Sequence, residues 1–197
     1  MVRKILLAIK IFLISSAMNA QTSNDVFELY LDFNEHYLHD QTKAIGVAEQ
    51  ILNSPEKLSK KQEINFYYKL ATIYENLHKP EMAVKYFSKV VASEPDFYVP
   101  HRALGYLFLK NANPVINKMN DATGNNAEYT KYFGEYRKIV KSALPHLEKA
   151  TACDPDEETL NLIKKLYQQI KEPDAITTLD ARLKKMGENC VTVLTDF

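Results

Sequence analysis

The feature that most constrains this chain is a helical hairpin pattern at residues 69–96, KLATIYENLHKPEMAVKYFSKVVASEPD. Two runs of apolar residues with i, i+3, i+4 spacing flank the segment HKPE, and this spacing is typical of amphipathic helices. Pro80 suits the first turn of the second helix, where its missing N–H is not needed. A single hairpin of this kind leaves its outer flanks uncovered, so the pattern predicts neighbouring hairpins. The residues that carry it are Leu70, Ala71 and Tyr74, then Ala83, Phe87, Val90 and Val91.

Similar pairs occur on both sides of this segment. YQQIKEPDAI, residues 167–176, repeats the spacing of YENLHKPEMA, residues 74–83. HRALGYLF and the later ALPHLEKATACDP supply the two halves of a third pair, at residues 101–108 and 143–155. Residues 25–52 give a first pair in an approximate register, carried by Leu31, Ala44, Ala48 and Ile51. The sequence therefore predicts an all-α chain of about four hairpins.

The second pair resembles a tetratricopeptide repeat, whose period is about 34 residues. The resemblance rests on Tyr67, Leu70, Ala71, Tyr74, Ala83, Phe87, Val90 and Pro95. It implies an α-α superhelix within a domain at residues 21–188, followed by a tail at 189–197. The hairpins are expected at about 25–53, 60–95, 98–155 and 157–187.

An insert at residues 111–136 interrupts the third hairpin. Its asparagines and Gly124 favour turns, so we expect a loop at 111–125 and then a long helix from about 126 to 152, kinked near Pro145. An aromatic stripe follows the loop with helical spacing, and it either packs on the body or contacts a partner. Its members are Tyr129, Tyr132, Phe133 and Tyr136.

The first 20 residues resemble a secretory signal peptide. Arg3 and Lys4 precede an apolar run from residue 5 to residue 14, and Ala20 marks the expected cleavage position. A retained membrane anchor and a buried amphipathic helix are the alternatives. Removing this segment takes away three of the 25 basic residues and leaves 22 against 25 acidic ones, a net charge of −3. A chain with this charge and no basic stripe is a poor nucleic-acid binder.

The resemblance implies that the first helix of each pair lines a concave groove for peptide segments; an ordinary solvated helix face is the alternative. The groove residues would be Asn65, Tyr68, Thr72, Glu75, Asn76, Arg102, Tyr106, Leu109 and Lys110. We therefore expect a non-enzymatic protein- or peptide-binding scaffold of the bacterial cell envelope, periplasmic or secreted. A permanent structural subunit of a larger envelope complex is a variant of this interpretation.

The alternative from a different class is a small envelope metal-binding sensor or hydrolase that uses His36 and His39. These histidines lie beside Glu35 and Asp40, but their spacing dictates no third ligand. No phosphate-binding glycine loop and no nucleophile elbow occurs in the sequence. We expect no metal, no cofactor and no membrane span in the mature chain.

Cys153 and Cys190 follow the second helices of neighbouring hairpins, so both are expected at the same end of the stack. A disulfide between them would pin the terminal hairpin. A buried Cys153 with a loose Cys190 is the alternative.

Overall fold

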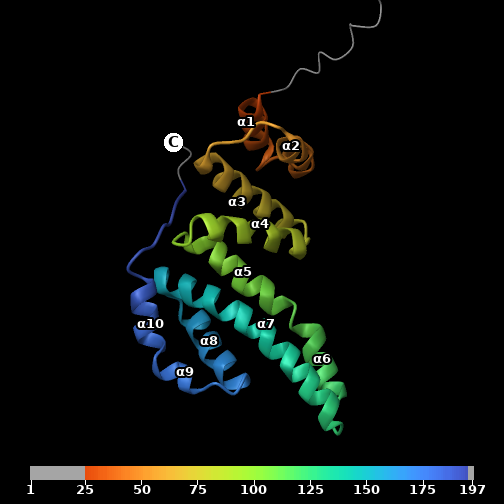
Figure 1. The fold of residues 1–197 in the computed structure, drawn as a ribbon, viewed down its shortest axis with the longest axis vertical. Helices are drawn as coiled ribbons and strands as arrows, with labels where there is room; N and C mark the ends of the chain where they lie inside the picture. The colour runs from red at the N-terminus through yellow and green to blue at the C-terminus, as the bar shows by residue number, and fades with distance from the viewer. Residues whose placement is uncertain (1–24, 195–197) are drawn as a thin grey trace, which may run out of the picture.

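The computed structural model describes residues 25–194, and within them the chain is almost entirely helical (Figure 1). The predicted signal peptide, residues 1–20, and the last three residues of the tail lie outside the described part. Among the described residues, no helix is long and apolar enough to cross a membrane. The prediction of an all-α fold is confirmed.

The helices pack as antiparallel pairs that follow one another along the long axis of the molecule (Figure 1). The first pair is α1 (Val26–His36) with α2 (Gln41–Asn53), and the second is α3 (Lys60–Asn76) with α4 (Pro80–Ser93). The third joins α5 (Tyr98–Lys110) to α7 (Asn126–Cys153), with α6 (Asn113–Asp121) between them. The fourth predicted pair, α8 (Glu157–Gln169) with α9 (Asp174–Thr177) and α10 (Leu179–Met186), lies beside α7, and α8 and α10 each pack on α7.

Local signals in the sequence fix where five of these helices begin. Asp25, Asp40, Asn125 and Asp156 each accept a hydrogen bond from a backbone N–H of the first turn that follows. Ser59 does the same at α3 and forms a reciprocal capping box with Gln62. Such side chains satisfy N–H groups that have no partner inside the helix.

The second and fourth pairs turn with the same backbone geometry. His78 and Lys171 both have left-handed φ angles, of 56° and 61°. In each turn the backbone N–H of the next residue donates a hydrogen bond to a tyrosine carbonyl oxygen. Lys79 donates to Tyr74 and Glu172 donates to Tyr167, both at 2.9 Å. This geometry ends a helix and reverses the chain. The repeated spacing in the sequence therefore corresponds to a repeated turn in the structure.

The hydrophobic core is divided into one main cluster from α1 to α5 and a second from α6 to α10, and Phe108 packs against both. Ala71, Ala83 and Leu70 are fully buried between α3 and α4, and Phe33 of α1 meets Phe66 of α3 edge to face at 5.0 Å between ring centroids. In the first pair the expected register is right for α2 but wrong by one residue for α1, where Tyr30 is 2% exposed and Leu31 is 46% exposed.

Gly105 lets α5 and α7 approach closely. A Cβ atom at this position would lie 2.5 Å from Leu147 Cδ2. Because the fully buried Leu147 side chain occupies that space, a larger residue at position 105 could enter only by displacing it.

The loop predicted at residues 111–125 is wrong over most of its length, because Asn113–Asp121 forms α6. Pro114 lies in its first turn, and Val115, Ile116 and Met119 pack against the cluster around α7. The asparagines at 113, 117 and 120 are exposed, so their weak helix propensity is outweighed by apolar contacts on the other face. Within the predicted loop, the chain turns at residues 111–112 and again at residues 122–125, where Gly124 has a φ of 100°.

α7 coincides with the long second helix expected from about 126 to 152 and runs through Pro145 as one element. Its first half and α6 project together past the other helices at one end of the molecule (Figure 1). The segment predicted as an insert, residues 111–136, is therefore largely a helical projection.

The described part of the tail folds back along the molecule (Figure 1). Cys190 is joined to Cys153 in a disulfide, with 5.6 Å between the two Cα atoms. One residue further on, Val191 forms an isolated parallel bridge with Phe97, in the segment between α4 and α5. The end of the chain thus contacts the second hairpin as well as the third.

Candidate functional site

The α3–α5 face contains eight of the nine groove residues expected from the sequence. We define it as Tyr68, Thr72, Glu75 and Asn76 of α3 with Arg102, Tyr106, Leu109 and Lys110 of α5. Glu75, Asn76, Tyr106 and Lys110 are exposed, and the other four are half-buried. Two successive first helices therefore offer aromatic, acidic and basic groups to solvent.

Asn65, the ninth expected residue, is not on this face. It is 6% exposed, and its Nδ2 has no hydrogen-bond partner. Ile64, Asn65 and Phe66 are all buried: Phe66 packs against Phe33 of α1, and Ile64 lies in the cluster on which the tail packs. The prediction that Asn65 contacts a partner is wrong for this reason.

Burial and charge link α3 to α5 across the face. Burial raises the pKa of Glu75, and the nearby ammonium group of Lys110 opposes that rise. Burial also raises the pKa of Tyr68, with further contributions from Tyr37 and Tyr98. Tyr37 and Tyr98 therefore lie beside this face, although the sequence analysis did not include them among the groove residues. Tyr98 could have been included, because it lies one helical turn before Arg102.

Arg102 and Tyr106 are also fixed by residues that follow α7 in the chain. Arg102 contacts Asp154 twice, at 3.0 Å to Oδ2 and at 3.1 Å to the backbone carbonyl oxygen. The Tyr106 hydroxyl lies 2.8 Å from Thr159 Oγ1, and the Thr159 hydroxyl donates to Asp156. The Tyr106 side chain is nevertheless exposed, so the face is held in place without being covered.

The aromatic stripe of the insert is divided between packing and exposure. Tyr136 is buried and donates a hydrogen bond to Gln169 Oε1 at 2.7 Å, so the prediction that it contacts a partner is wrong. Phe133 packs on the same cluster, beneath the Lys171 ammonium group. Tyr132 lies between Lys118 and Lys131, and Tyr129 is the most accessible of the four. Only the outer half of the stripe is open to another molecule.

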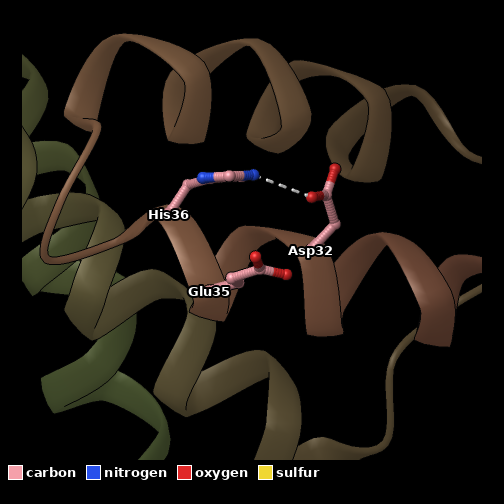
Figure 2. A group of neighbouring side chains, drawn as sticks. All are labelled: Asp32, Glu35 and His36. Atoms are coloured by element: carbon pink, nitrogen blue, oxygen red, sulfur yellow. Dashed lines mark ion pairs between the residues drawn. The ribbon is translucent and has the colours of Figure 1, made fainter.

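His36 lies beside Asp32 and Glu35 on α1, and the three side chains could contribute ligands to a cation (Figure 2). Their ligand atoms lie within 4.8 Å of one another, and His36 Nε2 is 3.1 Å from Asp32 Oδ1. His39, the other histidine predicted as a possible ligand, does not belong to this group. A structural zinc site usually has four protein ligands, so the group falls one short.

His101 and His146 form a neutral pair between α5 and α7. Their Nδ1 atoms are 2.9 Å apart, and His101 Nε2 lies 3.1 Å from the Pro95 carbonyl oxygen. Because that oxygen only accepts, Nε2 of His101 carries the proton, and the Nδ1–H of His146 donates to His101. Burial, His146 and Lys149 lower the pKa of His101 to about 4, and burial lowers the pKa of His146.

We expect this pair to make stability depend on pH. In the unfolded chain both rings take up protons as the pH falls below about 6.5. In the folded chain the His101 ring stays neutral until the pH falls to about 4. The stabilisation is therefore complete above pH 6.5 and is lost between 6.5 and 4. The unfolding midpoint temperature should fall between pH 7.5 and 5.0, and His101→Gln should make that fall smaller. An equal fall in both proteins would contradict the assignment.

A pocket of about 600 Å³ opens beside this pair, where the start of α5 meets α7 and α10. Pro95, His101, Pro145, Lys149, Lys185 and Met186 are among its lining residues. The Lys149 ammonium group donates hydrogen bonds to three oxygens of the protein, at 2.6–3.0 Å, so it has no N–H left for a ligand in the pocket. The pocket lies away from the α3–α5 face.

Comparison of the chain with family models, curated proteins and solved structures finds no match.

Proposed function

We propose that the protein is a non-enzymatic scaffold that binds a protein or peptide partner through the α3–α5 face. In this proposal the hairpins form a tetratricopeptide-like superhelix, and the face is its concave groove. The sequence resemblance and the equivalent turns at His78 and Lys171 support that arrangement.

The observation that carries the proposal is the placement of Tyr106. The residue is 43% exposed, yet its hydroxyl is anchored to Thr159 on the next pair. An aromatic side chain that is exposed but held in place loses little conformational freedom when a partner covers it. Tyrosine is also among the residues enriched at binding hot spots. Glu75 and Lys110 flank the region with opposite charges and would orient a partner.

We further propose that the protein acts outside the cytoplasm, in the bacterial cell envelope. The composition of residues 1–20 supports export, and so does the disulfide, because disulfides persist mainly in oxidising compartments.

The proposal is tested with peptides selected from a random display library on the purified chain. We expect Tyr106→Ala to weaken binding of a selected peptide by about 2 kcal/mol, roughly thirtyfold, because it removes a central aromatic contact. Fluorescence anisotropy of the labelled peptide measures the change.

Tyr129→Ala is the matched control, since Tyr129 is 41% exposed and lies on the projecting insert. It should leave the affinity unchanged. If Tyr129→Ala weakens binding and Tyr106→Ala does not, the insert is the contact surface and the assignment to the α3–α5 face fails.

A further inference from the structure

The tail lies on an apolar strip at the edge of the second hairpin. We define the edge strip as Ile64, Val90, Phe97 and Val99. Ile64, Val90 and Phe97 form its buried centre, each at most 7% exposed. Val191 and Leu194 of the tail pack on it and are themselves only half-buried. Two aliphatic side chains from the far end of the chain thus cover a surface built by α3, α4 and the segment that follows.

Backbone pairing accompanies these contacts. The Val191 N–H donates to the Asp96 carbonyl oxygen at 2.7 Å, and the Tyr98 N–H donates to the Val191 carbonyl oxygen at 3.3 Å. An extended segment that adds to exposed backbone groups in this way is a recurring mode of peptide recognition. If the tail left, the strip would present apolar side chains together with an unpaired donor and acceptor.

Two attachments hold the tail at the start of this contact. Lys149 Nζ donates to the carbonyl oxygens of Met186 and Asn189 and to Asp96 Oδ1, so it ties the tail to the same segment that the bridge uses. The Cys153–Cys190 disulfide fixes the residue just before Val191. Beyond it, Val193 is 71% exposed, so the tail is held firmly at one end and lightly at the other.

We propose that the edge strip is a docking site for an extended aliphatic segment of a partner protein, and that the tail occupies it in cis under control of the disulfide. The tail itself indicates the chemistry of the partner. That segment is extended, uncharged where it touches the strip, and carries aliphatic side chains at positions equivalent to Val191 and Leu194.

Release requires a dithiol reductant. Cys190 is exposed, so a thiolate of the reductant can attack its Sγ, which forms a mixed disulfide and releases Cys153 as a thiolate that takes up a proton. The second thiol of the reductant then displaces Cys190. Two cysteine thiols result, the reductant becomes a disulfide, and two electrons have passed to the protein. The tail is then held by noncovalent contacts alone.

The test uses a fluorescein-labelled synthetic peptide with the sequence of residues 188–194, carrying Cys190→Ser. Its binding to the full chain is measured by anisotropy for three samples: oxidised wild type, wild type reduced with dithiothreitol, and the reduced V191D/L194D variant. The variant changes only tail side chains, so its own tail should no longer compete. A control peptide carries the same two aspartates.

We expect saturable binding to V191D/L194D, at least tenfold weaker binding to reduced wild type, and at least a further tenfold weakening in oxidised wild type. The aspartate peptide should bind none of them. Equal binding to oxidised wild type and to the variant would overturn the proposal, as would no binding to a variant with a wild-type circular dichroism spectrum.

Hydrogen exchange on the wild-type chain gives a second test that does not depend on any variant. Protection of the Val191 and Tyr98 amides should fall at least tenfold on reduction, while amides in α3 keep theirs. Unchanged protection of both would overturn control by the disulfide. Tyr106→Ala should not affect binding of the tail peptide, so this proposal and the one for the α3–α5 face can fail separately.

Discussion

Replacing Cys153 and Cys190 together with alanine is expected to lower the free energy of unfolding by about 4 kcal/mol. The disulfide closes a loop with a sequence separation of 37 and joins the end of α7 to the tail beyond α10. Without it the unfolded chain gains conformational freedom, and the last pair loses its covalent attachment. Guanidinium unfolding followed by circular dichroism measures the change.

Reduction of the wild-type chain is the matched control, because it breaks the same bond without changing any side-chain volume. The reduced wild type and the double-alanine variant should unfold at similar denaturant concentrations. A double-alanine variant as stable as the oxidised wild type would show that the bond adds nothing to the fold.

Arg182→Ala should destabilise the protein by about 3–5 kcal/mol, because it leaves a buried carboxylate without its counter-charge. Glu148 is 3% exposed on α7 and accepts two hydrogen bonds from Arg182 of α10, at 2.6 and 3.0 Å. The Tyr167 hydroxyl of α8 donates to the same carboxylate at 2.6 Å, and burial together with this bond raises the pKa of Tyr167 to about 12. The network joins three helices, so its loss should release the terminal pair.

The matched control is Glu148→Leu combined with Arg182→Met, which removes both charges and keeps apolar volume. We expect this double variant to recover more than half of the stability lost in Arg182→Ala, because no uncompensated charge remains. Urea unfolding of the wild type and both variants gives the comparison. If the double variant is as unstable as Arg182→Ala, packing rather than the buried charge explains the loss.

The sequence predicted the elements that depend on local pattern. The turns at His78 and Lys171 were found because a tyrosine and a proline recur at fixed spacing around them. The burial of Ala71 and Ala83 followed from helical periodicity. These signals lie within one hairpin, where residues close in sequence are also close in space.

The errors arose where long-range packing overrides local preference. The asparagines of α6 favour turns, but Val115, Ile116 and Met119 gain contacts on α7 that lie outside any local pattern. Asn65 was expected on a solvated face, although elements remote in sequence cover the start of α3.

The path of the tail could not be predicted either. Lys149 reads as one surface lysine among many, and only the fold brings Asp96 within 2.7 Å of it. Val191 reaches Phe97 through the disulfide and the turn after α10, which no periodicity reports. The edge strip therefore had no signal in the sequence, whereas the α3–α5 face had one in the spacing of Arg102, Tyr106 and Lys110.

Site-specific photo-crosslinking tests the central claim most directly. Benzoylphenylalanine is placed either at position 76, an exposed site of α3 on the α3–α5 face, or at position 85, an exposed site on α4. With a peptide selected on the wild-type chain, we predict crosslinked product from position 76 and none from position 85. Product from position 85 alone would place the partner on the opposite helices and contradict a binding face formed by α3 and α5.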